Sequence, residues 1–168
     1  MDVSVIRDTE ERFRADPDAA RATPTVTATL ANGRARLSAG PFNWEADLPA
    51  ALGGGNLAPS PTAYLLGALA ACGVVFMRDT LAPQLGIQVD DVSAVARCAT
   101  DARGLLGMDG ARGDLGDVEI EIRISSPEPP ERIAELERAW LERCPIYLAI
   151  SKPNAVRVTV ASAEPATT

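Results

Sequence analysis

The sequence of 168 residues contains no histidine. This absence excludes Ser-His-Asp and Cys-His nucleophilic mechanisms, zinc sites that use histidine, and the HExxH helix of metalloproteases. Cysteine is scarce: the three residues form no CxxC metal or redox pair, and their odd number argues against the disulfide framework of a secreted protein. Few catalytic chemistries are left, and among them thiol chemistry is the obvious one.

Positive charge is also in short supply. Lys and Arg total 16 against 23 Asp and Glu, which gives a formal net charge of −7, so the chain lacks the electrostatic footprint of a nucleic-acid-binding protein. Apolar residues make up 46% and charged residues 23%, values typical of a globular protein. The length suits one domain, and we expect residues 1–168 to form it, with 1–23 and 162–168 loosely ordered.

The sequence has no long uninterrupted hydrophobic run. Residues 1–24 carry charged side chains throughout and contain no apolar segment of an export signal. The longest apolar stretch, 63–77, is interrupted by two glycines and stops at Arg78 and Asp79, short of the roughly 20 residues that a membrane span needs. We therefore expect a cytoplasmic protein that has no membrane partner.

Strands are predicted where apolar and polar residues alternate. The first two flank Asn32-Gly33, which is the strongest short signal for a hairpin turn, and a third continues them into an antiparallel meander. The predicted strands are 25–30, 34–39, 42–47, 87–99, 118–124 and 156–160, with a long Gly- and Asp-rich loop at 100–117.

Two helices are predicted from apolar side chains that recur at spacings of three and four. The first starts at Pro61, which an N-cap serine precedes, and is ended by Pro83 and Gly86. The second starts within 127–130 and is stopped by Pro145. This order of elements indicates an α+β fold with the helices on one face of the sheet.

The three cysteines differ in their predicted surroundings. Cys98 lies on an alternating strand face and is predicted to be a core residue. Cys72, on the apolar stripe of the first helix, and Cys144, at the end of the second, point into the same core region or interface, where they could meet. Taken alone, each of them also fits a buried cysteine that acts as a small hydrophobe.

A cysteine does peroxide or disulfide chemistry only as a thiolate, which needs a nearby cation or helix N-terminus to lower its pKa from about 8.5. Cys72 lies about three turns into its helix, where the helix dipole gives little help. An arginine must therefore supply the positive charge.

Two segments carry a more specific pattern. The run from Asp47 to Cys72 contains an acidic-x-Pro start, Gly-Gly, a Pro-Ser-Pro cap and a Leu/Ala helix that reaches Ala-Ala-Cys, and the later segment is Glu142-Arg-Cys-Pro145. In this order they resemble the OsmC/Ohr family, and the resemblance covers roughly residues 25–160. It implies an OsmC-like fold, with antiparallel sheets and a long central cysteine-bearing helix, in an intertwined homodimer whose active sites lie at the subunit interface.

By the same resemblance, Cys72 is the peroxidatic cysteine. Its thiolate attacks an organic, fatty-acid-like hydroperoxide and becomes a sulfenic acid, which condenses with Cys144 to form a disulfide. An external dithiol such as protein-bound lipoamide then reduces the disulfide, and no bound cofactor or metal is expected. The resemblance thus implies a peroxidase of the oxidative stress response.

The sequence departs from the family at one position. Hydroperoxide-reducing members carry a glutamate early in the cysteine helix, which orients an arginine over the thiolate, whereas this chain has Thr62, Ala63 and Tyr64 there. A buried arginine without a carboxylate is costly to hold. Either another acid, Glu45 or Asp47, substitutes for the glutamate, or the arginine is mobile or absent.

The N-terminal sheet offers two arginines, Arg34 and Arg36, which share one face. Arg36 lies nearer the middle of the meander and is the predicted third catalytic residue, although a solvated strand arginine looks the same in sequence. Two other functions stay open: a dimeric binding or redox-sensing module that holds a small hydrophobic ligand at its interface, and a purely structural dimer.

Overall fold

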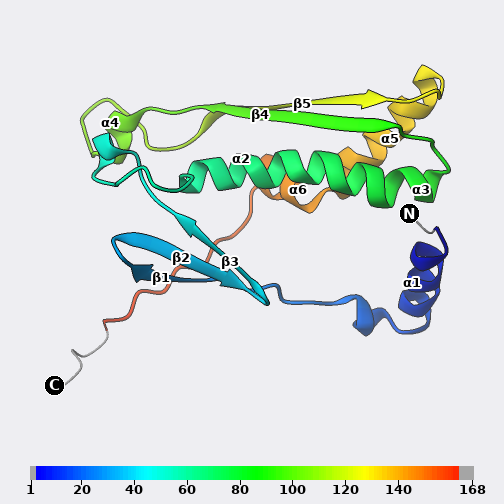
Figure 1. Ribbon diagram of the computed structural model, residues 1–168, viewed down its shortest axis with the longest axis horizontal. Coiled ribbons are helices and arrows are strands. Elements are labelled where there is room, and N and C mark those ends of the chain that lie inside the picture. The colour runs from blue at the N-terminus through cyan, green and yellow to red at the C-terminus, as the bar shows by residue number, and fades with distance from the viewer. Residues whose placement is uncertain (1–2, 163–168) are drawn as a thin grey trace.

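One long helix runs through the middle of the molecule, between a two-stranded and a three-stranded sheet (Figure 1). The computed structural model describes residues 3–162. It confirms the predicted α+β class with antiparallel sheets. The elements in chain order are α1 (Val3–Ala15), η1 (Pro17–Ala20), β1 (Thr27–Ala31), β2 (Arg34–Ala39), β3 (Phe42–Ala46), η2 (Ala50–Leu52), α2 (Pro61–Ala71), the π-helical segment η3 (Cys72–Leu81), α3 (Ala82–Leu85), β4 (Asp91–Ala99), α4 (Ala102–Leu105), β5 (Gly116–Ser125), α5 (Pro130–Arg143) and α6 (Pro145–Ser151).

The strands form two antiparallel sheets. β1, β2 and β3 make the predicted meander, and the turn between β1 and β2 lies at Asn32 and Gly33, with φ of 52° and 75°. Positive φ at both central residues is the geometry that makes Asn-Gly a hairpin signal. β4 and β5 pair separately, with Val92 opposite Ile124.

The central helix has the bounds that the sequence predicts, from Pro61 to the turn at Gly86. Ser60 accepts the Ala63 N–H at its start, and the helix then continues without a break through α2, η3 and α3 from Pro61 to Leu85. Within the helix, Arg78 pairs with the neighbouring aspartate at the surface. By length and composition the helix could cross a membrane, but it packs against β4, β5 and α5 as the core helix of a folded domain.

The core lies between this helix, the β4–β5 sheet and α5. Its largest fully buried side chains are Met77, Leu81, Leu136 and Cys144. Gly73 lets the helix approach β5 closely, because a Cβ there would stand 3.1 Å from Cδ1 of Ile122. Both long helices therefore cover one face of the β4–β5 sheet, as predicted.

Several local expectations were wrong. Residues 3–15, expected to be loosely ordered, form α1, which an ion pair between Arg14 and Glu10 stabilises. The expected loop 100–117 contains α4, because Asp101 caps a short helix there. Pro145 does not only stop a helix; it also begins α6, since proline fits the first helical position.

The predicted last strand, 156–160, is not a strand in the structure. Its three valines alternate as expected but are 82%, 77% and 91% exposed, because no strand of the described chain lies beside them to accept their backbone hydrogen bonds. The expected loose order of 162–168 falls, from residue 163 onwards, outside the described residues.

Candidate active site

The structure brings together the two sulfur atoms that were expected to meet. Cys72 lies where α2 passes into the π-helical segment, and Cys144 lies between α5 and α6. Their Sγ atoms are 2.8 Å apart, and both residues are free thiols. Cys144 is fully buried, whereas Cys72 is only partly buried. Two cysteines far apart in sequence thus form one dithiol, of which Cys72 is the member open to solvent.

Trp140 ties both cysteines to the core. Its indole Nε1 donates to the Cys72 carbonyl at 3.2 Å, and its own carbonyl accepts the Cys144 N–H at 2.8 Å. The spacing of Trp140 along its helix, one residue in the apolar pattern, indicates only a packing role. Its indole N–H is the feature of the sequence that could have indicated a further contact, because a buried indole usually finds a hydrogen-bond acceptor.

Within one chain the Cys72 thiol is held neutral. Burial raises its pKa to about 12, with further contributions from the hydrogen bond to Cys144 and the charge interaction with it. A hydrogen bond from the Ile146 N–H acts in the opposite direction and lowers the pKa. No arginine of residues 3–162 is among the groups that shift it. A cation that makes Cys72 a thiolate must therefore come from outside these contacts.

The meander meets the start of the central helix through a hydrogen bond between Tyr64 and Glu45. Arg34 on β2 pairs with Glu45 on β3, with Nε 3.1 Å from Oε2, and the Tyr64 hydroxyl on α2 donates to the Glu45 carbonyl. Tyr64 belongs to the segment where the family resemblance expects the missing glutamate. The residue that pairs with Arg34 is thus joined to this turn of the helix through its backbone carbonyl.

Arg36, the predicted catalytic arginine, is exposed on β2, where it lies opposite Glu45 in the sheet register. In the part of the chain that the structure describes, it forms no ion pair and does not reach Cys72. Its catalytic role stays a prediction.

Asp47 organises the loop that leads into the central helix. The residue is only 7% exposed, and its carboxylate accepts hydrogen bonds from the N–H groups of Leu57, Leu48 and Gly55. These bonds, led by the one from Leu57, hold the pKa of Asp47 below its usual value, against the effect of its burial. A Cβ at Gly54 would lie 2.0 Å from the Leu48 carbonyl oxygen, so glycine is required there. This explains the acidic-x-Pro and Gly-Gly parts of the sequence pattern: they fix the loop before the helix.

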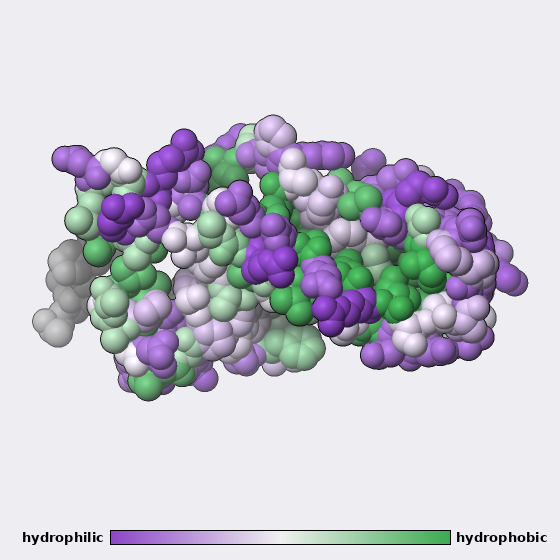
Figure 2. Space-filling model, turned by 90° about the horizontal axis from the view of Figure 1, so that it is seen from above, coloured by the Kyte–Doolittle hydropathy of each residue, from purple (hydrophilic) through white to green (hydrophobic). Residues whose placement is uncertain are grey.

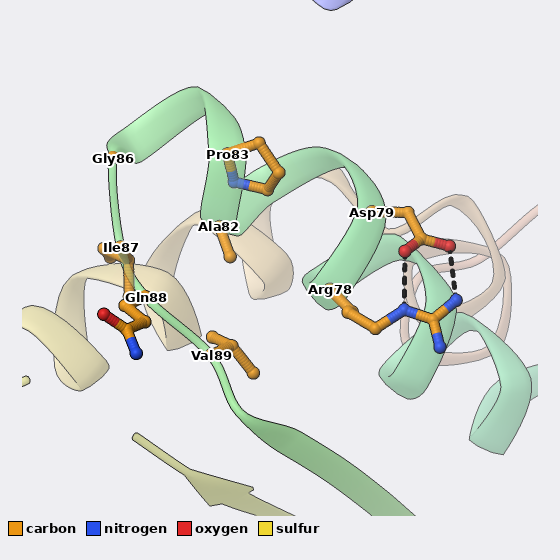
Figure 3. Close-up of a pocket in the computed structure, with 8 residues that line it drawn as sticks. All are labelled: Arg78, Asp79, Ala82, Pro83, Gly86, Ile87, Gln88 and Val89. Carbon is orange, nitrogen blue, oxygen red and sulfur yellow. Dashed lines mark hydrogen bonds and ion pairs between the residues drawn. The ribbon is translucent and has the colours of Figure 1, made fainter. Parts of the chain in front are cut away.

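A groove of about 710 Å³ lies at the far end of the helix, and its lining includes neither Cys72 nor Cys144 (Figure 3). Arg78 and Asp79 face each other on one side of it, joined by two hydrogen bonds of 2.5 and 2.7 Å. Cys98, predicted to be a core residue, is only half-buried on β4 and does not belong to the buried core cluster, because it lies near the end of β4, beyond the part of the strand that packs against that cluster. In residues 3–162, no group of three or more His, Cys, Asp or Glu side chains is arranged to hold a metal ion.

Comparison with known proteins gives a consistent result. The family model for "OsmC-like protein" matches residues 53–160. An OsmC-like protein from Mycoplasma pneumoniae superposes with a TM-score of 0.64 at 22% identity, covering 77% of this chain and 88% of that one. An organic hydroperoxide resistance protein OsmC from Legionella pneumophila gives 0.59 at 22% identity, with coverage of 77% and 89%. One from Elizabethkingia anophelis gives 0.58 at 19% identity, with coverage of 77% and 88%. A search of curated proteins gives no significant match.

Proposed function

The chain belongs to the OsmC-like protein family, and from this we propose that it is a cysteine-based peroxidase for organic hydroperoxides. The observation that carries the proposal is the 2.8 Å contact between the free thiols of Cys72 and Cys144. Two structural neighbours are named organic hydroperoxide resistance proteins, which agrees with a peroxide substrate.

The partly exposed Cys72 is the cysteine that a hydroperoxide can reach, since Cys144 is fully buried. The Cys72 thiolate attacks the outer oxygen of the hydroperoxide, the O–O bond breaks, and sulfur becomes a sulfenic acid. The alkoxide that leaves takes up one proton, equal to the one lost when the thiol ionised, and becomes an alcohol. Cys144 then attacks that sulfur, water leaves, and a disulfide forms. An external dithiol, such as protein-bound lipoamide, restores both thiols, which suits a cytoplasmic location where thiols are kept reduced.

The proposed active unit is a homodimer. The 18-residue apolar window of the central helix is only 28% buried in one chain, and Leu65 and Val75 on it are exposed. In the view from above, hydrophobic side chains gather in a central band between hydrophilic ones (Figure 2). Such a patch marks an interaction surface, and a second copy of the chain would cover it.

The dimer also supplies the missing cation. Arg34 is neutralised by Glu45, whereas Arg36 is exposed, so Arg36 is the arginine of this strand that is available to a thiol of the second copy. An arginine within about 4–6 Å lowers the pKa of an acid by about 1–3 units, which counters the raised pKa of Cys72.

The raised pKa of Cys72 in the single chain favours a second function, that of a module which binds a hydrophobic ligand and whose thiols react only slowly. Turnover separates the two. The reduced protein, supplied with dihydrolipoamide, should consume cumene hydroperoxide, and Cys72→Ser should abolish this while Cys98→Ser leaves it intact. Undiminished turnover in Cys72→Ser would overturn the peroxidase proposal.

A further inference from the structure

Trp140 is joined to both thiol-bearing residues at once. The indole N–H bonds to the Cys72 carbonyl, the Trp140 carbonyl accepts the Cys144 N–H, and the two sulfurs touch. Together these three contacts form a closed cycle of interactions that joins the central helix to α5. Trp140 is 2% exposed, so its indole hydrogen bond is shielded from competing water.

The contact is made at a special point of the helix. Cys72 is the first residue of the π-helical segment, where the helix widens, and the indole bonds to the carbonyl of that residue. Wide helical turns are rare and often occur at functional sites. On the other side, the Trp140 ring packs on Tyr147, with ring centroids 5.3 Å apart, and the Tyr147 N–H points at the Cys144 sulfur at 3.4 Å. Trp140 is thus held from both ends of the dithiol.

We propose that Trp140 is a positioning residue that sets the reduction potential of the Cys72–Cys144 pair. The proposal rests on the proposed function only in taking this pair as the redox centre. Disulfide formation is favoured when the scaffold keeps the thiols in contact in the reduced state, because little conformational freedom is then lost on bonding. The indole hydrogen bond supplies that restraint, and without it the central helix and α5 hold the two sulfurs less closely.

The test is the equilibrium of the full-length protein with dithiothreitol. The protein dithiol gives two electrons and two protons to cyclic oxidised dithiothreitol, whose S–S bond opens to a dithiol while the Cys72–Cys144 bond forms. Trp140→Phe keeps an aromatic ring and removes the N–H. We expect its equilibrium constant for disulfide formation to fall about three- to tenfold, the effect of one typical hydrogen bond. Trp44→Phe, which changes the chain's other tryptophan on β3, should leave the constant unchanged.

An equilibrium constant for Trp140→Phe equal to that of the wild type would overturn the inference, as would equal losses in the two variants. If Trp140→Phe does not fold, the NMR signal of the Trp140 indole N–H proton provides the test instead. The signal is assigned to Trp140 because it remains in the spectrum of Trp44→Phe. That proton must be protected from solvent exchange and must shift on oxidation, and an unprotected or unmoved signal would overturn the inference. Failure of the peroxidase proposal would give a different result. Hydroperoxide turnover would then be absent, while the equilibrium with dithiothreitol would still depend on Trp140.

Discussion

The sulfur of Cys144 lies 2.8 Å from that of Cys72 and helps to keep it protonated. Changing Cys144 to alanine removes the hydrogen bond and the charge interaction but leaves most of the burial. In a monomeric variant, where no arginine of a second copy lies near the thiol, we expect the pKa of Cys72 to fall from about 12 but to stay above its ordinary 9.0. Thiolate absorbance followed across a pH titration, in a Cys98→Ser background, measures this. A pKa that does not move would contradict the role given to Cys144.

The same pKa predicts a pH dependence of folding. In a monomeric variant, which lacks the arginine of a second copy, the folded chain binds the Cys72 proton more tightly than the unfolded chain, so the contribution to stability is complete below pH 9.0 and is lost as the pH rises towards about 12. The free energy of unfolding of this variant should therefore fall, relative to that of the same variant carrying Cys72→Ser, as the pH rises above 9.0, and denaturant titrations measure this. Parallel pH profiles above pH 9.0 would contradict the burial of a neutral thiol.

The lowered pKa of Asp47 predicts that stability is lost at acid pH rather than at alkaline pH. Its folded pKa is lowered, so its contribution to stability is present above the ordinary 3.8 and is lost as the pH falls through the folded value. Asp47→Asn, which offers fewer acceptors to three backbone N–H groups, should lower the stability at neutral pH and lose this acid dependence. Chemical denaturation at neutral and acid pH measures both. A variant with the acid dependence of the wild type would show that another carboxylate is responsible.

Gly73 marks the close approach of the central helix to β5. Gly73→Val should lower the free energy of unfolding by about 1–3 kcal/mol through overpacking against Ile122. Adding Ile122→Val removes the nearest atom, Cδ1, and should recover part of the loss in a double-mutant cycle. Strictly additive effects would contradict the direct contact.

The homodimer predicts an effect of charge on the exposed side of the central helix. Val75, 48% exposed, changed to aspartate should give a monomer in sedimentation experiments, because a charge would be buried without a partner at the interface. Val95→Asp, at a 59% exposed position on β4, is the matched control and should stay a dimer. A monomeric wild type, or a dimeric Val75→Asp, would contradict the proposed interface.

The sequence was informative where local chemistry decides the structure. Ser60 and Pro61 predicted the start of the central helix, and the positions of Cys72 and Cys144 on apolar faces predicted that they share one region. The sequence was uninformative where a contact between distant segments determines the local structure. Pro145 can end or begin a helix, and in this chain it does both because α6 packs back towards α2.

The site was predictable to a similar degree. The thiol pair follows from helix periodicity and the family pattern, but the pairing of Arg34 with Glu45 depends on a diagonal contact across β2 and β3 that alternation does not specify. The alternating valines of 156–160 show the same limit, because a strand needs a neighbour and the described chain provides none.

The most direct test of the central claim is a count of free thiols after one turnover. Reduced wild-type protein has three cysteines, and mixing with one equivalent of cumene hydroperoxide should rapidly leave one free thiol, Cys98, with Cys72 joined to Cys144. Cys72→Ser should lose no thiol at a comparable rate. Three thiols remaining in the wild type, or rapid loss in Cys72→Ser, would contradict the account.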